Sequence, residues 1–136
     1  MCNLTKHLKD ERVFGYKVVA KKDYKYYAIA MGFEYKQPSM TFSKDDRLVQ
    51  KSLSPYFRDF ILNTKKRAFK ENMVGRTAAF FDVEEAAYLK HGVCYSCSMS
   101  YKVVIVMVEL SNDIMEGFYG TGIVYAGRTI KILNEV

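Results

Sequence analysis

Lys102-Val-Val-Ile-Val-Met-Val-Glu-Leu110 carries the strongest structural signal in this chain of 136 residues. A continuous run of β-branched residues is typical of a strand that is buried on both faces. A second β-rich run, Ile123-Val-Tyr-Ala-Gly-Arg-Thr-Ile-Lys-Ile-Leu133, follows the glycine-spaced segment Gly117-Phe-Tyr-Gly-Thr-Gly122. Because glycine permits tight backbone turns, we expect this segment to be a flexible connection between strands at about 101–110 and 122–134.

Further strand patterns lie in the first half of the chain. Residues 13–20 and 26–33 predict a β-hairpin, and the charged stretch Lys21-Lys-Asp-Tyr-Lys25 has the length and composition of its loop. Residues 75–81 predict another short strand. The stretch from Pro38 to Leu53 is polar and unpatterned, which indicates a long surface connection.

Two segments have the pattern of a helix without a preceding strand. Leu4 and Leu8 would share one face of a short N-terminal helix over residues 4–12, with charged residues around them. Ser54-Pro55 favours the start of a helix over 55–71, because serine caps free amides and proline has the dihedral that the first helical position needs.

A third helix has the clearest boundaries. Asp82 and Glu85 form a capping-box pattern that opens a helix over 83–91, and Gly92 is expected to close it. The order of these elements predicts an α+β fold, with residues 1–136 as a single domain. We expect a largely antiparallel β-sheet with two main helices and a short N-terminal helix.

The composition limits where the protein is expected to act. Hydrophobic residues make up 49% of the chain, enough to bury a core without disulfides or metal. Three cysteines are an odd number and do not suggest a secreted disulfide framework. The longest apolar run is too short to cross a bilayer and the amino terminus has no apolar signal core, so we expect a cytoplasmic protein without a membrane partner.

The charge balance favours anionic partners. The formal net charge is +6, which suits nucleotides, nucleic acid or an acidic protein. The basic residues are scattered among acidic ones, so a dedicated nucleic-acid surface is possible but not favoured. Eleven tyrosines and nine phenylalanines indicate an aromatic-rich sheet whose rings can also stack on bases.

The tripeptide Gly-Arg-Thr occurs twice, each time just ahead of an apolar run. Arginine presents a planar fork of donors that suits phosphate, threonine adds a hydroxyl, and glycine lets the backbone approach a ligand. The candidate phosphate-binding residues are therefore Arg76, Thr77, Arg128 and Thr129. The alternative is that both tripeptides are simply strand starts with an exposed arginine.

Phe118 and Tyr119 are the candidate base-stacking residues. They lie between glycines, where two aromatic side chains would form a mobile flap able to cover a base. The spacing of these glycines matches neither a P-loop nor a dinucleotide fingerprint.

His91, Cys94 and Cys97 have a spacing compatible with zinc, but a second paired knuckle is missing. We therefore expect no metal and no cofactor, with the cysteines as small apolar side chains. No nucleophile lies in a recognisable catalytic signature, so the chain is not expected to be an enzyme.

Several segments in this order resemble small proteins encoded by bacteriophages. They are Phe14-Gly-Tyr-Lys-Val-Val19, Tyr26-Tyr-Ala-Ile29, Gly75-Arg-Thr-Ala-Ala-Phe-Phe81 with Glu85-Ala86, and Val124-x-Ala-Gly-x-x-Ile-Lys-Ile132. Among such proteins the chain looks most like the sponges that sequester nucleotide signals and oppose Thoeris-type or cyclic-oligonucleotide defence. The resemblance covers most of the chain in general plan. It implies an oligomer that binds a cyclic nucleotide-derived signal without cleaving it.

The leading functional hypothesis is a non-catalytic, homo-oligomeric protein of the host-cell cytoplasm that sequesters a small anionic nucleotide. The ligand would be a cyclic dinucleotide or oligonucleotide, or a cyclic ADP-ribose derivative, and its capture would counter host immunity. The alternative is a basic protein- or nucleic-acid-binding effector that uses the helix at 55–71 to inhibit a host factor. An enzyme that hydrolyses nucleotides is a third and weaker reading.

Overall fold

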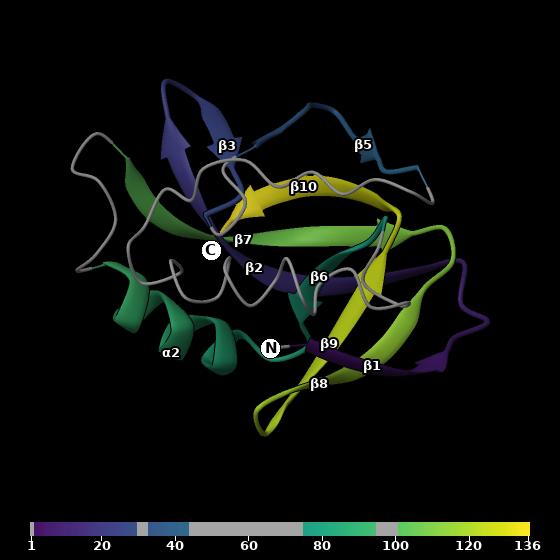
Figure 1. Cartoon of the computed structure of the whole chain (residues 1–136). Helices are drawn as coiled ribbons and strands as arrows, with labels where there is room; N and C mark the ends of the chain where they lie inside the picture. The colour runs from purple at the N-terminus through teal and green to yellow at the C-terminus, as the bar shows by residue number, and fades with distance from the viewer. Residues whose placement is uncertain (1, 30–32, 44–74, 95–100) are drawn as a thin grey trace.

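The computed structural model describes residues 2–29, 33–43, 75–94 and 101–136. All strands in these residues belong to one antiparallel sheet, in the order β1-β8-β9-β6-β2-β7-β10-β5, with β3 attached to β2 and β4 to β3 (Figure 1). The single helix of the described residues is α2 (Val83–Cys94). The strands are β1 (Cys2–His7), β2 (Arg12–Lys22), β3 (Lys25–Tyr27), β4 (Glu34–Tyr35), β5 (Met40–Thr41), β6 (Thr77–Phe80), β7 (Lys102–Ser111), β8 (Met115–Tyr119), β9 (Gly122–Gly127) and β10 (Thr129–Glu135).

Strand β7 lies in the middle of the sheet and is buried on both faces. Val103 and Ile105 belong to a core that also contains Ala86 of α2, whereas Val104 and Val106 belong to a core on the opposite face. This confirms the prediction from the run of β-branched residues, since each face of the strand packs against its own cover.

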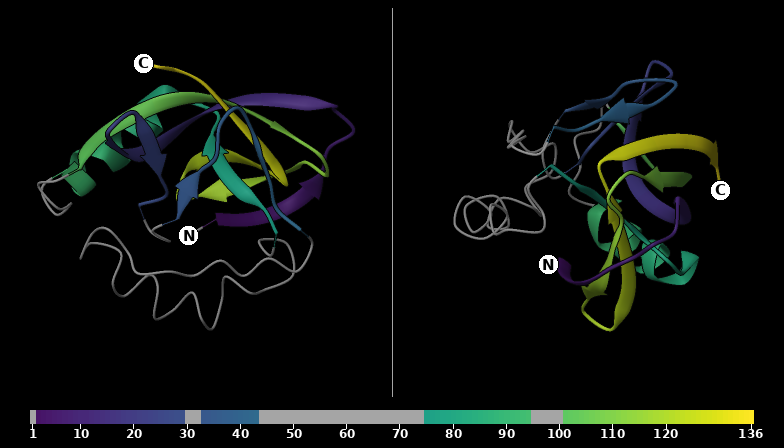
Figure 2. Two further views of the ribbon diagram at one scale, coloured as in Figure 1. Left: turned by 90° about the horizontal axis from the view of Figure 1, so that it is seen from above. Right: turned by 90° about the vertical axis from the view of Figure 1, so that its right-hand side faces the viewer.

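Different parts of the chain cover the two cores. Helix α2 packs across β2 and β7 on one face. On the other face lies an arm formed by residues 25–29 and 33–43, which carries Phe33, Tyr35 and Phe42. The Phe33 ring meets the other two edge-on, at centroid distances of 5.2 Å to Tyr35 and 5.6 Å to Phe42. Figure 2 shows β2 and β7 between α2 and the arm.

The sheet bends sharply where β6 meets β2. These strands pair only at Tyr16 and Phe80, and the Lys17 ammonium donates a hydrogen bond to the carbonyl oxygen of Ala78 where the ladder ends. The β8–β9 hairpin consequently runs obliquely to β7 (Figure 1).

The predicted α+β fold, with two main helices and a short N-terminal helix, is wrong. Residues 2–7 form β1, an edge strand that pairs with β8, and most of the described chain is strand. Leu4 and Leu8 are four residues apart, a spacing that places side chains on one face of a helix and equally of a strand. Pairing with β8 resolves this ambiguity in favour of a strand. The predicted helix at 55–71 lies outside the described residues.

The second β-rich run is two strands instead of one. It breaks at Arg128, because β9 pairs with β8 and β6 whereas β10 pairs with β7 and β5. The segment Gly117–Gly122 was expected to be a flexible connection, but it is the end of β8 and a two-residue turn into β9. Gly120 has a φ of 62° in this turn, a value that glycine adopts without strain.

Helix α2 begins where the sequence predicts. The Glu84 amide donates to Asp82 Oδ1 at 3.1 Å, which is the expected N-terminal cap. The helix continues past Gly92 to Cys94, so Gly92 does not close it. Among the described residues no helix is long and apolar enough to cross a membrane.

The predicted hairpin at 13–20 and 26–33 is present as β2 and β3. Its turn consists of Asp23 and Tyr24 alone, because β2 extends to Lys22 and β3 starts at Lys25. The predicted surface connection contains β5, and its residues from 44 onward lie outside the described part of the chain.

Candidate functional site

The arginines of the two Gly-Arg-Thr segments meet at one end of the sheet, around Asp113. Arg76 Nη2 lies 2.6 Å from Asp113 Oδ2, and Arg76 Nε donates to the Asp113 carbonyl oxygen at 2.9 Å. Arg128 reaches the same Oδ2 with Nη2 at 3.0 Å and Nε at 3.1 Å. Its Nη1 donates to the Gly75 carbonyl oxygen at 3.2 Å. We call Arg76, Arg128 and Asp113 the arginine cluster; it ties together the start of β6 and the turns that precede β8 and β10.

The cations of the arginine cluster are closed off from solvent. The side chain of Arg76 is 4% exposed and that of Arg128 15%, against 40% for Asp113. Burial works to raise the pKa of Asp113, but the hydrogen bonds and charges of Arg76 and then Arg128 outweigh it, so that this pKa lies below its ordinary value. A phosphate that approaches these guanidinium groups must compete with a carboxylate bound to both.

The two predicted threonines lie beside the arginines. Thr77 is buried in β6, opposite Gly127. The Thr129 hydroxyl accepts a hydrogen bond from Asn112 Nδ2 at 2.6 Å and lies 2.9 Å from the Thr41 hydroxyl. Both threonines therefore serve the contacts between strands and turns at this end of the sheet.

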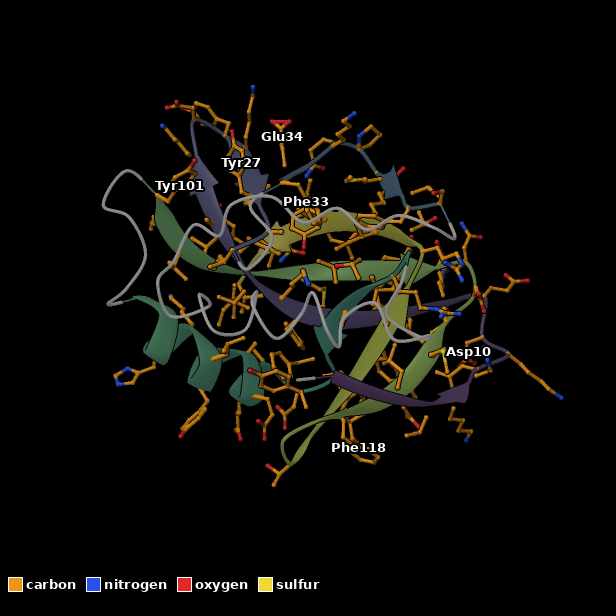
Figure 3. The ribbon with its side chains drawn as sticks, viewed as in Figure 1. Asp10, Tyr27, Phe33, Glu34, Tyr101 and Phe118 are labelled. Carbon is orange, nitrogen blue, oxygen red and sulfur yellow. The ribbon has the colours of Figure 1, made fainter. Side chains whose placement is uncertain are left out.

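The two predicted aromatic residues lie elsewhere. Phe118 and Tyr119 are residues of β8, so they are part of the sheet. Tyr119 packs edge-on against Phe80 at a centroid distance of 5.5 Å, while Phe118 is exposed on the β8–β9 hairpin (Figure 3). Four residues separate Phe118 from Asp113 along the chain, and three of them belong to β8. The predicted phosphate and base contacts thus form two separate groups.

A shallow groove of about 230 Å³ lies between α2 and the β8–β9 hairpin. Small-molecule sites typically occupy roughly 300–1,000 Å³, so the groove is undersized for a nucleotide. The Glu85 side chain at its border lies close against Gly122, which brings negative charge to the groove and disfavours phosphate. The lining residues are Phe80, Glu85, Tyr88, Leu89, His91, Gly92 and Tyr119.

Lysines gather at the other end of β7, where no site was predicted. Lys22 lies directly opposite Lys25 in the β2–β3 hairpin. In the neighbouring ladder Lys21 lies directly opposite Lys102. Like charges that face each other across two strands destabilise a sheet. Lys21 and Lys22 are consecutive residues of β2, so the two pairs lie on opposite faces of the sheet. Each pair attracts anions to its own face at this end of the sheet.

Aromatic rings accompany these lysines. Lys22 Nζ lies 5.3 Å from the centroid of the Tyr101 ring, a cation–π arrangement. Tyr27 meets Tyr101 edge-on at 5.5 Å, and Figure 3 shows the two rings together at this end of the sheet. We call these residues the lysine–tyrosine end: Lys21, Lys22, Lys25, Lys102, Tyr27 and Tyr101.

Two carboxylates partly neutralise the lysine–tyrosine end. Glu135 forms an ion pair with Lys21, and this hydrogen bond raises the pKa of Lys21 and lowers that of Glu135. Glu34 Oε1 lies 3.7 Å from Lys25 Nζ. Within the described part of the chain no ion pair joins Lys22 to a carboxylate. Lys22 is therefore the cation here with the least internal compensation.

No group of three His, Cys, Asp or Glu side chains in the described ranges is placed to hold a metal ion. His91 lies on α2 at the groove, and Cys97 lies outside the described residues.

No family model, curated protein or solved structure matches the chain.

A signal for the lysine–tyrosine end was present in Lys21-Lys-Asp-Tyr-Lys25. All five residues were expected to form the hairpin loop, in which none of them would pair with another. A two-residue turn fixes the register of its hairpin and sets Lys22 opposite Lys25. The contact with Tyr101 depends on the non-local pairing of β2 with β7, so the local sequence does not predict it.

Proposed function

We propose that the protein captures a small anionic nucleotide without converting it, and that the ligand binds at the lysine–tyrosine end. The observation that supports this is the position of Lys22, which faces Lys25 across the hairpin while its ammonium group lies over Tyr101. An anion between the two lysines relieves their repulsion. A neighbouring aromatic ring can stack on a base, so phosphate and base find their partners at one place.

Accessibility favours this end over the arginine cluster. The Lys25 side chain is 62% exposed, and Lys22 is exposed as well. A phosphate there displaces water and loosely held counterions, whereas at Arg76 and Arg128 it has to displace Asp113. The role of the two arginines in phosphate binding stays a prediction, and so does base stacking by Phe118 and Tyr119.

The proposed ligand class follows from the resemblance to phage sponges. It comprises cyclic dinucleotides or oligonucleotides and cyclic ADP-ribose derivatives. We propose that the protein acts in the cytoplasm of an infected cell, where sequestration of such a signal counters host immunity.

Retention of the ligand tests the function. The protein is incubated with cyclic dinucleotides and cyclic ADP-ribose isomers, separated from free ligand, heat-denatured, and the supernatant is chromatographed. We expect one of these ligands to be retained and then released unchanged. Release of a product would indicate an enzyme, and failure to retain any of them would favour a protein- or nucleic-acid-binding effector; either result contradicts the proposal.

The double variant Lys22→Thr/Lys25→Thr tests the location. It should weaken binding by about tenfold or more, which corresponds to at least about 1.4 kcal/mol. Stability should change little, because the repulsion between the two lysines disappears together with the exposed Lys25–Glu34 ion pair and the Lys22–Tyr101 contact. The control Lys6→Thr/Lys131→Thr removes the same charge from exposed positions of β1 and β10. Equal weakening in both double variants would show that the ligand senses only the net charge.

We also propose that the protein is a homo-oligomer. Phe118 lies opposite Ile123, whose carbonyl oxygen accepts a hydrogen bond from the amide of Phe81 at 3.0 Å, and all three side chains are exposed. Adjacent exposed apolar side chains are typical of contact surfaces between proteins. Light scattering tests this, and the mass of one chain, 15.7 kDa, would contradict it.

A further inference from the structure

The turn at the tip of the β2–β3 hairpin holds a tyrosine in a backbone conformation that tyrosine rarely adopts. Asp23 has a φ of 51° and Tyr24 a φ of 65°. Two successive positive φ angles are the pattern of a type I′ turn, in which glycine and asparagine predominate. A bulky residue is strained there, because its Cβ approaches the following carbonyl oxygen.

A second turn with the same pattern has residues that suit it. Asn112 and Asp113 have φ angles of 62° and 54°, and these residue types tolerate such angles because their short polar side chains form local hydrogen bonds. Both side chains are also engaged, with Thr129 and with the two arginines. Tyr24, in contrast, is 91% exposed, so almost no packing offsets its strain.

We propose that Tyr24 stacks on the base of the nucleotide bound at the lysine–tyrosine end. Lys22 and Lys25 flank the turn and face each other, so a phosphate between them brings the attached base within reach of the exposed ring. Strained residues that persist on a surface concentrate at binding sites, where the ligand supplies the missing contact. This inference rests on the proposed function and refines its ligand class: the site prefers a nucleotide to a base-free polyphosphate.

The test is a calorimetric titration of the full chain with ADP and with pyrophosphate, which share a diphosphate and differ in the nucleoside. We expect the unmodified protein to bind ADP at least about tenfold more tightly, since stacking of one base is worth that much. The Tyr24→Gly variant should bind ADP at least about tenfold more weakly than the unmodified protein does, with the affinity for pyrophosphate unchanged. Its melting temperature should rise by about 2–4 °C, because glycine adopts this φ without strain.

The conservative variant Tyr24→Phe keeps the ring and should keep the preference for ADP. Equal binding of the two probes by the unmodified protein would overturn the inference, as would an affinity for ADP that Tyr24→Gly leaves unchanged. A lower melting temperature in Tyr24→Gly would overturn the claim of strain. In each of these cases the proposed function stands as long as Lys22→Thr/Lys25→Thr weakens binding of pyrophosphate. If neither probe binds, the inference fails and the retention experiment decides the proposed function separately.

Discussion

Each end of β7 carries two cations beside one carboxylate, but the two ends differ in how far the cations are buried. At one end Arg76 and Arg128 surround Asp113; at the other, roughly 30 Å away along the strand, Lys21 and Lys102 lie near Glu135. Both carboxylates have a pKa below the ordinary value because of their cations. The difference lies in burial, since the guanidinium groups are enclosed whereas Lys21 is only half-buried and Lys102 is exposed.

The comparison indicates that burial of the cation determines its role. A buried cation cannot lose its carboxylate without a large penalty, so the arginine cluster acts as a fixed joint between turns. An exposed cation gains little from its counterion and exchanges it easily, so the lysine–tyrosine end can accept an incoming anion. Each end should therefore respond to mutation in its own way.

The substitution Asp113→Asn should have the largest effect on stability. It leaves two enclosed guanidinium groups without their carboxylate and should lower the free energy of unfolding by about 2–4 kcal/mol, measured by urea denaturation. The control Asp10→Asn removes a charge from an exposed position outside the strands and should stay near the unmodified protein. Ligand affinity should not change in either variant. A loss of binding in Asp113→Asn with the fold intact would contradict a purely structural role for the arginine cluster.

Acid should act mainly through the arginine cluster. The pKa of Asp113 in the folded protein lies below its ordinary value of 3.8. Its contribution to stability is therefore complete above the unfolded-state pKa and is lost as the pH falls through the lower folded-state pKa. We expect the free energy of unfolding to decrease below about pH 4, and to decrease less steeply in Asp113→Asn. Parallel curves for the two proteins would assign the acid sensitivity to other carboxylates.

The substitution Glu135→Gln should have the smallest effect. It removes the matching carboxylate at the lysine–tyrosine end, but the pair with Lys21 is partly exposed and screened. The melting temperature should change by less than about 2 °C, and binding of an anionic ligand should become slightly tighter because a competing charge is gone. A destabilisation as large as that of Asp113→Asn would show that burial does not distinguish the two ends.

Local patterns predicted the parts of the fold that depend on one segment at a time. The β-branched run predicted β7, and Asp82 predicted the start of α2. β1 was missed because the spacing of Leu4 and Leu8 fits two periodicities. The break at Arg128 was missed because it depends on which strands β9 and β10 pair with, and such pairing is set far away in the sequence.

The candidate site was predictable only in part. The Gly-Arg-Thr repeat singled out Arg76 and Arg128 as phosphate ligands, which stays a prediction. That they meet at Asp113 was not predicted, because Asp113 lies in a different turn and has no motif. Lys22 lies opposite Lys25 because of the register of the hairpin. A prediction that misjudges the length of the turn by one residue gives a different register and misses this pair.

A map of amide chemical shifts during titration with the retained nucleotide tests most directly which end binds the ligand. The arginine cluster and the lysine–tyrosine end lie at opposite ends of β7 in the described sheet, so the shift changes can be assigned to one or the other. We predict that the largest changes fall on residues 22–25 and on Tyr101 and Lys102. Changes centred on residues 75–77 and 127–129, with the hairpin tip unaffected, would contradict the assignment and place the ligand at the arginine cluster.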